Sequence, residues 1–248
     1  MQSIQISNAH KSFGSVHAID GLTLTIAEGQ VCAFLGHNGA GKTTTLRLLL
    51  GLLEPDAGEI SLFGLDPMRD GERVRGMCGV LSEDVGLYEP LTVYENLIYY
   101  TDIYGIPRAE ARRRIEELLD RFDIADKLHL PVKGFSTGMK KKVALIRAML
   151  HRPRLLLLDE PTNGLDPVMT QELREMLVSL AKESGATIIM TTHNLDEVQK
   201  MCDQIFVFRH GRNVFSGSMR ALEQDAQYRE NGAFSLEKLY LSLEGGAG

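Results

Sequence analysis

The pattern of apolar and polar positions predicts short buried strands that alternate with helices. Residues 31–35 and 155–158 are unbroken apolar runs of strand length, typical of strands buried on both faces of a sheet. Residues 23–26 alternate apolar with polar side chains, and a turn follows. Further strands are expected at residues 60–63, 187–191, 205–208 and around Val214, and helices at residues 43–53, 167–184 and 195–201. This alternation predicts a mainly parallel sheet with helices on both faces.

Residues 91–150 have a helical pattern instead. Ile115, Leu118, Leu119 and Phe122 recur at the spacing of one helix face. On the other faces, Arg113 with Glu117 and Glu117 with Arg121 are predicted as ion pairs four residues apart. The arginines of this segment are compatible with a nucleic-acid patch, but the acids interleaved with them favour a solvated helix face.

The composition is that of an ordinary globular protein. Hydrophobic residues make up 44% and charged residues 24% of the 248 residues, which excludes a disordered chain and suits one large domain or two small ones. The formal net charge of −6 argues against a generic nucleic-acid-binding surface, which would be basic.

The three cysteines and the apolar runs bear on the compartment. Cys32, Cys78 and Cys202 show no CxxC spacing, and an odd, scattered set fits a reducing environment. The richest apolar run, residues 48–53, is far too short to span a bilayer, and no secretory signal is visible at the start. The sequence therefore predicts a soluble, intracellular chain.

Residues 36–43 fit the phosphate-binding pattern G-x-x-x-x-G-K-[ST] between a predicted strand and a predicted helix. Its glycines let backbone N–H groups converge on phosphate oxygens at a helix N-terminus. Lys42 would reach the β- and γ-phosphates, and the Thr43 hydroxyl would hold Mg²⁺. A glycine-rich turn that binds nothing is the alternative, which the flanking strand and helix disfavour. The predicted nucleotide-binding residues are Gly36, His37, Asn38, Gly39, Ala40, Gly41, Lys42, Thr43 and Thr44.

Two carboxylates, Asp159 and Glu160, follow the apolar run 155–158. Ligands bind at the carboxyl ends of the strands in an open α/β sheet. Asp159 is predicted to accept hydrogen bonds from the Mg²⁺ water shell, and Glu160 to polarise the attacking water. Adjacent acids after a strand are more often a solvated strand end, but the phosphate loop favours the functional interpretation.

Further motifs carry a family resemblance. Residues 135–139, followed by Lys140, Lys141 and Lys142, resemble the signature motif of ATP-binding-cassette (ABC) ATPases. Residues 161–166 resemble the D-loop of that family, His193 its switch histidine, and Phe13 the aromatic residue that stacks on adenine. The motifs occur in the family's order across residues 11–217, so the resemblance is specific to the family.

The resemblance implies roles for these residues. Ser136 is predicted to cap a helix, whose free N–H groups face an anion; in the family that anion is the γ-phosphate bound by the opposite subunit. The resemblance implies that four residues contact the ATP of the partner subunit: Ser136, Thr137, Gly138 and Asp166. His193 is expected to act with Glu160 in catalysis, and Phe13 and Val16 to contact the nucleotide.

This sequence departs from the family pattern at three positions. Glu83 stands where the family has the Q-loop glutamine, and its carboxylate is expected to join Thr43 and Asp159 around the metal. Thr137 replaces the first glycine of the signature, and Met139 replaces its usual glutamine. These variations resemble those of ABC-2-type exporter cassettes, which favours export.

The implied fold is a P-loop NTPase with a RecA-like α/β core, an antiparallel β part and an inserted α-helical subdomain. The ABC ATPase domain is expected at residues 1–220, with the core at 1–85 and 151–220 and the helical subdomain at 86–150. The tail, residues 221–248, has little signal and is expected to fray at its end.

The implied function is that of the ATP-binding, Mg²⁺-dependent ATP-hydrolysing subunit of an ABC transporter, powering transport, with export favoured. It would dimerise on binding ATP, dock on a separate membrane permease and lie in the cytoplasm at the inner face of the membrane. The permease is expected to contact residues 84–106, which are rich in tyrosine, with Leu91, Leu97 and Ile98 in the core; the alternative is that these aromatics only pack the helical subdomain.

Two other functions compete with this one. A soluble ABC ATPase of DNA repair, chromosome organisation or translation would show a long coiled coil, zinc cysteines or two cassettes, and the acidic balance disfavours a nucleic-acid partner. A non-hydrolysing regulatory cassette is disfavoured because Lys42, Asp159, Glu160 and His193 are all present.

Overall fold

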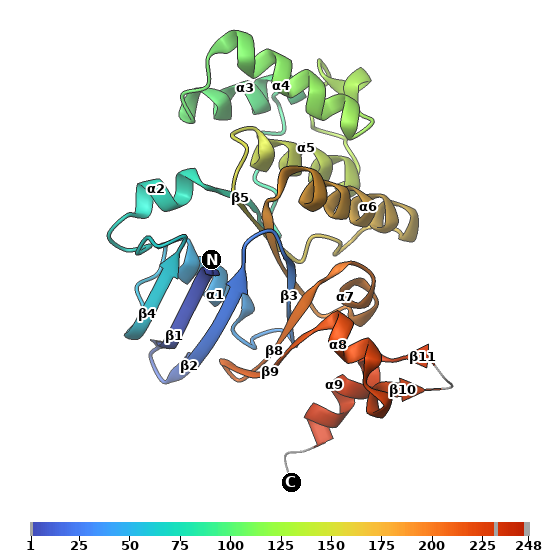
Figure 1. The fold of residues 1–248 in the computed structure, drawn as a ribbon. Helices are drawn as coiled ribbons and strands as arrows, with labels where there is room; N and C mark the ends of the chain where they lie inside the picture. The colour runs from blue at the N-terminus through green and yellow to red at the C-terminus, as the bar shows by residue number, and fades with distance from the viewer. Residues whose placement is uncertain (1, 231–232, 246–248) are drawn as a thin grey trace.

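The computed structural model describes residues 2–230 and 233–245, arranged around a six-stranded sheet (Figure 1). Its strand order is β5-β6-β7-β3-β8-β9. The strands are β3 (Val31–Leu35), β5 (Cys78–Leu81), β6 (Leu155–Asp159), β7 (Thr187–Thr192), β8 (Gln204–Arg209) and β9 (Arg212–Ser218). Neighbours from β5 to β8 are parallel, and only β9 runs antiparallel to its partner β8. The predicted α/β class with a mainly parallel sheet is confirmed.

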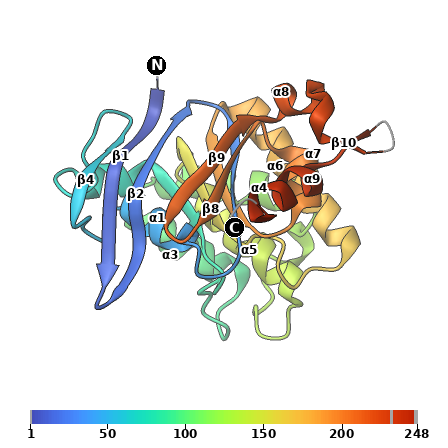
Figure 2. The ribbon, with the colours of Figure 1, turned by 90° about the horizontal axis from the view of Figure 1, so that it is seen from below.

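An antiparallel sheet of three strands, in the order β2-β1-β4, lies beside this one (Figure 2). The strands are β1 (Gln2–Phe13), β2 (Val16–Ala27) and β4 (Ala57–Leu62). The sequence pattern predicts only the second half of β2 and part of β4. The strand β1 was not predicted, because its pairing with β2 shifts register around residues 6–12. These shifts break the alternation of apolar side chains.

Helices cover the large sheet. They are α1 (Lys42–Leu49), α2 (Gly71–Gly76), α3 (Val93–Ile103), α4 (Arg108–Arg121), α5 (Thr137–Met149), α6 (Pro167–Ser184) and α7 (Leu195–Met201), with the short 3-10 helix η1 (Ala125–Lys127). The helices α3, α4 and α5 lie together at the top of Figure 1, and α5 packs against the sheet. The predicted helix at 43–53 ends earlier, at Leu49, because Gly51 has a φ of 64° and its backbone lies against Pro67.

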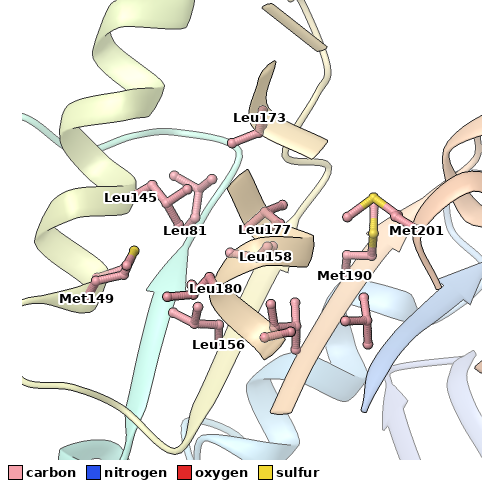
Figure 3. Close-up of a cluster of buried hydrophobic side chains, with 14 of the residues drawn as sticks. Leu81, Leu145, Met149, Leu156, Leu158, Leu173, Leu177, Leu180, Met190 and Met201 are labelled. Carbon is pink, nitrogen blue, oxygen red and sulfur yellow. The ribbon is translucent and has the colours of Figure 1, made fainter. Parts of the chain in front are cut away.

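Successive leucines of β6 point into two different cores. Leu156 and Leu158 pack with α5 and α6 in the cluster drawn in Figure 3. Leu155 and Leu157 belong to a second cluster on the opposite face, with Phe34 of β3. A strand alternates its side chains between faces, so a continuous apolar run is what burial on both faces requires.

The arginine-rich helix α4 is a salt-bridged surface helix with one buried face. Ile115, Leu119 and Phe122 are at most 1% exposed, as the predicted stripe requires. Arg113 pairs with Glu117 at 3.0 Å. The predicted pair of Glu117 with Arg121 is wrong, because Arg121 turns instead to Glu183 of α6, also at 3.0 Å.

The C-terminal segment has more structure than its sequence indicated. It contains α8 (Met219–Gln224), the 3-10 helix η2 (Ala226–Tyr228), β10 (Arg229–Glu230), β11 (Ala233–Phe234) and α9 (Leu236–Gly245). Leu236 and Leu239 of α9 are 1% exposed and join the main core. The predicted fraying concerns residues 246–248, which lie outside the described residues. Within residues 2–230 and 233–245, no helix has both the length and the apolarity needed to span a membrane.

All three cysteines are free and buried. Burial raises the pKa of the Cys78 thiol to about 12, and it also raises the pKa of Cys32 and of Cys202. These side chains therefore act as small apolar core residues in the thiol form.

Candidate functional site

The predicted phosphate loop links β3 to α1, and it encloses the end of the Lys42 side chain. Lys42 is 5% exposed, and its Nζ donates to the carbonyl oxygens of Gly36 at 2.5 Å and His37 at 3.4 Å. Gly41, which precedes the helix, has a φ of 106°, a conformation that favours glycine. The loop residues His37, Asn38 and Gly39 are exposed. A cation thus lies at a helix N-terminus beneath an open loop, which is a suitable arrangement for an anion.

Asp159 meets the phosphate loop at the carboxyl edge of the sheet. Thr43 Oγ1 lies 3.1 and 3.0 Å from the two carboxylate oxygens of Asp159. Thr191 Oγ1, at the end of the neighbouring strand β7, donates to Asp159 Oδ1 at 2.5 Å. The strand order explains this meeting, because β7 lies between β6 and β3.

Glu160 lies between Lys42 and His193. Lys42 Nζ is 3.3 Å from Glu160 Oε1, and His193 Nδ1 is 3.0 Å from Glu160 Oε2. Beyond the ion pair, Oε1 has no hydrogen-bond partner among the described residues. The Glu160 side chain is 13% exposed, whereas that of His193 is 59% exposed. The structure therefore brings together the two residues that were predicted to be catalytic.

The backbone of Glu160 is strained and is held on its amide side. Its φ of 46° lies in the left-handed region, which costs a non-glycine residue about 1–3 kcal/mol. The Glu160 amide donates to both the carbonyl oxygen and the Oγ1 of Thr191, at 3.2 and 3.0 Å. Strain of this kind persists only where surrounding contacts fix the backbone conformation. The fixed backbone sets the position from which the Glu160 side chain extends.

Ser136 begins α5 as the sequence predicted. Its side chain accepts a hydrogen bond from the Met139 amide at 3.3 Å, and both Ser136 and Thr137 are exposed. Gly138 is buried, and a Cβ there would lie 2.0 Å from Met169 Cε of α6. The glycine therefore has a packing role that the motif did not reveal: it lets α5 lie against the start of α6.

Asp166 and Glu83 lie on the segments that flank this helix start. Asp166 caps α6, and its Oδ1 accepts from the Val168 and Met169 amides at 2.9 and 3.0 Å. Glu83, just past β5, accepts from Asn163 Nδ2 at 3.3 Å. In the described part of the chain, Glu83 contacts neither Thr43 nor Asp159, the two residues predicted to share a metal with it.

Phe13 and Val16 are exposed at the turn between β1 and β2. They are 49% and 62% exposed and pair with each other across the hairpin. The start of β2 touches the phosphate loop, because a Cβ on Gly41 would lie 2.7 Å from the Ala18 carbonyl oxygen. The hairpin therefore presents a half-exposed aromatic ring, with Lys11 Nζ 5.9 Å from its centre, at the end of a strand that contacts the loop.

Sequence reasoning missed three supporting residues: Thr191, Lys141 and Glu197. Glu197 is 2% exposed and accepts hydrogen bonds from Thr162 Oγ1, from Thr192 Oγ1 at 3.1 Å and from Asn194 Nδ2 at 3.3 Å. It ties the loop after β6 to the loop after β7. The only sequence signal was the polar end of an otherwise apolar strand, Thr191 and Thr192 before His193.

Comparisons with known proteins agree with this geometry. The family model described as ABC transporter (ABC_tran) matches residues 19–163. The chain is 39% identical to the ABC transporter ATP-binding protein NatA of Bacillus subtilis, over 90% of this chain and 91% of that protein. It is 37% identical to Nod factor export ATP-binding protein I of Ralstonia nicotianae, over 88% of this chain and 68% of that protein. A solved ATP-binding subunit of an ABC transporter shares 33% identity with a TM-score of 0.85, covering 98% and 99% of the two chains.

The fold and the loop define a P-loop ATP-binding protein. More particularly, the chain belongs to the ABC transporter family as an ATP-binding subunit, and this family hydrolyses ATP. The resemblance and the fold class predicted from the motifs are confirmed. The soluble ABC ATPases of DNA repair, chromosome organisation or translation are not favoured, since both relatives are named for transport.

Proposed function

We propose that this chain is the ATPase motor of an ABC exporter and that it works on a separate membrane permease from the cytoplasmic side. The observation that supports hydrolysis is the Glu160 carboxylate held between Lys42 and His193. Export is supported by Glu83, Thr137 and Met139 at three motif positions, and by the relative named for Nod factor export. The net charge of −6 gives no reason to expect a nucleic-acid partner.

We propose a role for each residue of the site from its contacts. Lys42 Nζ now faces the Gly36 carbonyl oxygen and Glu160 Oε1, two oxygen acceptors that stand in for the β- and γ-phosphate oxygens. When the Lys42 ammonium binds the phosphates instead, Glu160 Oε1 becomes free to accept a proton from the attacking water. His193, bonded to the other carboxylate oxygen, orients Glu160 and faces the γ-phosphate. Phe13 and Val16 provide the surface for the adenine ring.

Thr43 and Asp159 fit a magnesium ion. Their hydroxyl and carboxylate oxygens lie 3.0–3.1 Å apart and are the hard donors that Mg²⁺ prefers. Mg²⁺ usually takes one or two protein ligands and leaves its other positions to water and phosphates, so two residues suffice. Bound there, the ion would supply charge neutralisation at the phosphates. Glu83 joins this set in our proposal only through its position in a motif that resembles the Q-loop of the family.

The purified chain is expected to hydrolyse ATP only in the presence of a divalent cation. Phosphate release, measured with Mg²⁺ and then with excess chelator, should fall to the background rate and return when Mg²⁺ is restored. Thr43→Ala should raise the Mg²⁺ concentration needed for half-maximal activity, because it removes one proposed ligand. Full activity in chelator would contradict the magnesium site, and no activity under any condition would contradict the motor function itself.

An exposed group of tyrosines on and before α3 is the proposed docking surface for the permease. Tyr88 and Tyr99 are 51% and 49% exposed, and their rings meet edge to face at 6.0 Å. Leu97 and Ile98 are buried as predicted, but Leu91 is 36% exposed and so is not the core residue that was predicted. Leu91 lies in the segment before the helix, where its backbone bonds to Tyr88 and Val132. Tyrosine is favoured at interfaces because it buries area while its hydroxyl stays bonded.

Tyr99→Ala is expected to uncouple transport from hydrolysis. The isolated variant should keep its basal ATPase rate. Cargo uptake into inverted vesicles that contain the permease should drop at least about fivefold, because losing one interface anchor costs about 1 kcal/mol or more of binding free energy. Leu52→Ala, which truncates an apolar residue elsewhere that is also more than half exposed (59%), is the control. Wild-type transport by the Tyr99→Ala variant would place the docking surface elsewhere.

A further inference from the structure

A buried lysine on α5 holds the backbone that follows β6. Lys141 is 4% exposed, and its Nζ donates to the carbonyl oxygens of Glu160 at 3.2 Å, Pro161 at 2.9 Å and Asn163 at 2.6 Å. An ammonium group has three donors, so these carbonyls use its full capacity. Burial lowers the pKa of Lys141, an effect opposed by nearby carboxylates.

The two neighbouring lysines make different contacts. Lys140 pairs with Glu89, and Lys142 pairs with Glu172 of α6 at 3.0 Å. Both partner carboxylates are about half exposed, at 54% and 50%. Exposed ion pairs of this kind contribute little to stability. The three consecutive lysines therefore differ in surroundings, and only the middle one reaches the catalytic segment.

Lys141 supplies the carbonyl-side restraint on Glu160. Thr191 fixes the amide of Glu160, and Lys141 fixes its carbonyl oxygen, so the strained peptide with a φ of 46° is held from both ends. The direction of the carboxylate follows from this backbone. A shift of Lys141 would therefore rotate Glu160 away from Lys42 and His193.

The same helix begins at the exposed signature residues. Ser136 and Thr137 are exposed at its first turn, and Lys141 follows about one and a half turns later on the 3.6-residue repeat. Gly138, between them, is packed against Met169 of α6. Because a helix moves as a rigid element, a displacement at its start is passed to Lys141.

We propose that Lys141 is a positioning residue that couples the two ATP sites of the dimer. This inference rests on the proposed function. When the start of α5 binds the γ-phosphate of ATP held by the opposite subunit, Lys141 holds the Glu160 peptide of its own subunit in the hydrolytic orientation. A displacement of the start of α5 that accompanies loss of the partner's ATP would thereby disturb the alignment of the catalytic carboxylate.

The test compares Lys141→Met with Lys142→Met in the full chain. The matched control removes the same charge from the next position of the same helix. We expect Lys141→Met to lower kcat at least about 10-fold, since small misplacements of a catalytic group cost up to roughly 100-fold, while the Kd for ATP stays within about twofold. Lys142→Met should match the wild type, and Lys141→Arg, which keeps several donors, should recover part of kcat.

A double-mutant cycle with Ser136→Ala distinguishes coupling from a local structural role. If Lys141 acts through the helix, the double variant should lose no more kcat than the worse single variant, because residues that act as a unit are not additive. If the fold-losses in kcat of the two single variants multiplied in the double variant, the coupling would be overturned. An unchanged kcat in Lys141→Met, or an equal loss in Lys142→Met, would also overturn it. So would a joint loss of ATP affinity and thermal stability that Lys141→Arg does not repair. An inactive wild type would overturn the proposed function as well.

Discussion

Glu160→Gln is expected to bind ATP but to hydrolyse it at least about 100-fold more slowly than the wild type, the lower scale of general-base catalysis. The amide keeps the size of the side chain and one acceptor oxygen, so the strained backbone and the phosphate loop should persist. It cannot take a proton from water at neutral pH. It also removes the negative charge that lies 3.3 Å from Lys42, which leaves that ammonium free for the phosphates.

The measurement pairs phosphate release with equilibrium binding of ATP. Glu172→Gln, which makes the same change in an exposed carboxylate paired with Lys142, serves as the control and should retain the wild-type rate. Turnover at the wild-type rate by Glu160→Gln would remove Glu160 from the mechanism. Loss of ATP binding together with turnover would assign it to nucleotide binding instead.

Ser136→Arg is expected to abolish the ATP-dependent dimer. In a Glu160→Gln background with ATP, the chain should elute as a dimer, and adding Ser136→Arg should leave a monomer that still binds nucleotide. The exposed first turn of α5 offers backbone N–H groups to an anion, and no residue of the described chain supplies one to Ser136. A bulky cation in that place blocks the partner's approach. In a chain that keeps Glu160, Ser136→Arg should therefore lower turnover about 100-fold or more, the effect of losing one oxyanion donor.

Ser218→Arg provides the matched control for this experiment. Ser218 is an exposed serine at the start of α8, and its side chain makes no capping hydrogen bond. This variant should still dimerise with ATP. If Ser136→Arg eluted as a dimer, the start of α5 would not be part of the subunit interface. An absence of any dimer with ATP would count against an ATP-dependent dimer of the isolated subunit.

The sequence could predict the elements whose signal is local. The strands β3 and β6 could be predicted from their apolar runs, because both faces of the large sheet are buried. The helices α6 and α7 also end at the predicted residues. The phosphate loop and the pair Asp159 and Glu160 could also be found, since their chemistry fixes residue type and spacing.

The remaining features depend on contacts between distant segments. Lys141 is one of three consecutive lysines, and nothing in the sequence shows that it alone is buried against three carbonyls. Gly138 lies against Met169 of the next helix, a contact that its own motif does not indicate. Arg121 pairs with Glu183 of α6 rather than with a residue of its own helix. Register shifts concealed β1. For Lys141, Gly138 and Arg121, the deciding partner lies in a different element of the chain.

The burial of the three native cysteines makes this chain a suitable background for site-specific labelling. Their exposed fractions are 0% for Cys32, 2% for Cys78 and 8% for Cys202, and their raised pKa values leave almost no thiolate, the form that reacts with maleimides. A single cysteine introduced at an exposed position therefore becomes the reactive thiol of the folded protein. Fluorescent or spin probes attached there can follow the approach of two subunits over time without removal of any native cysteine.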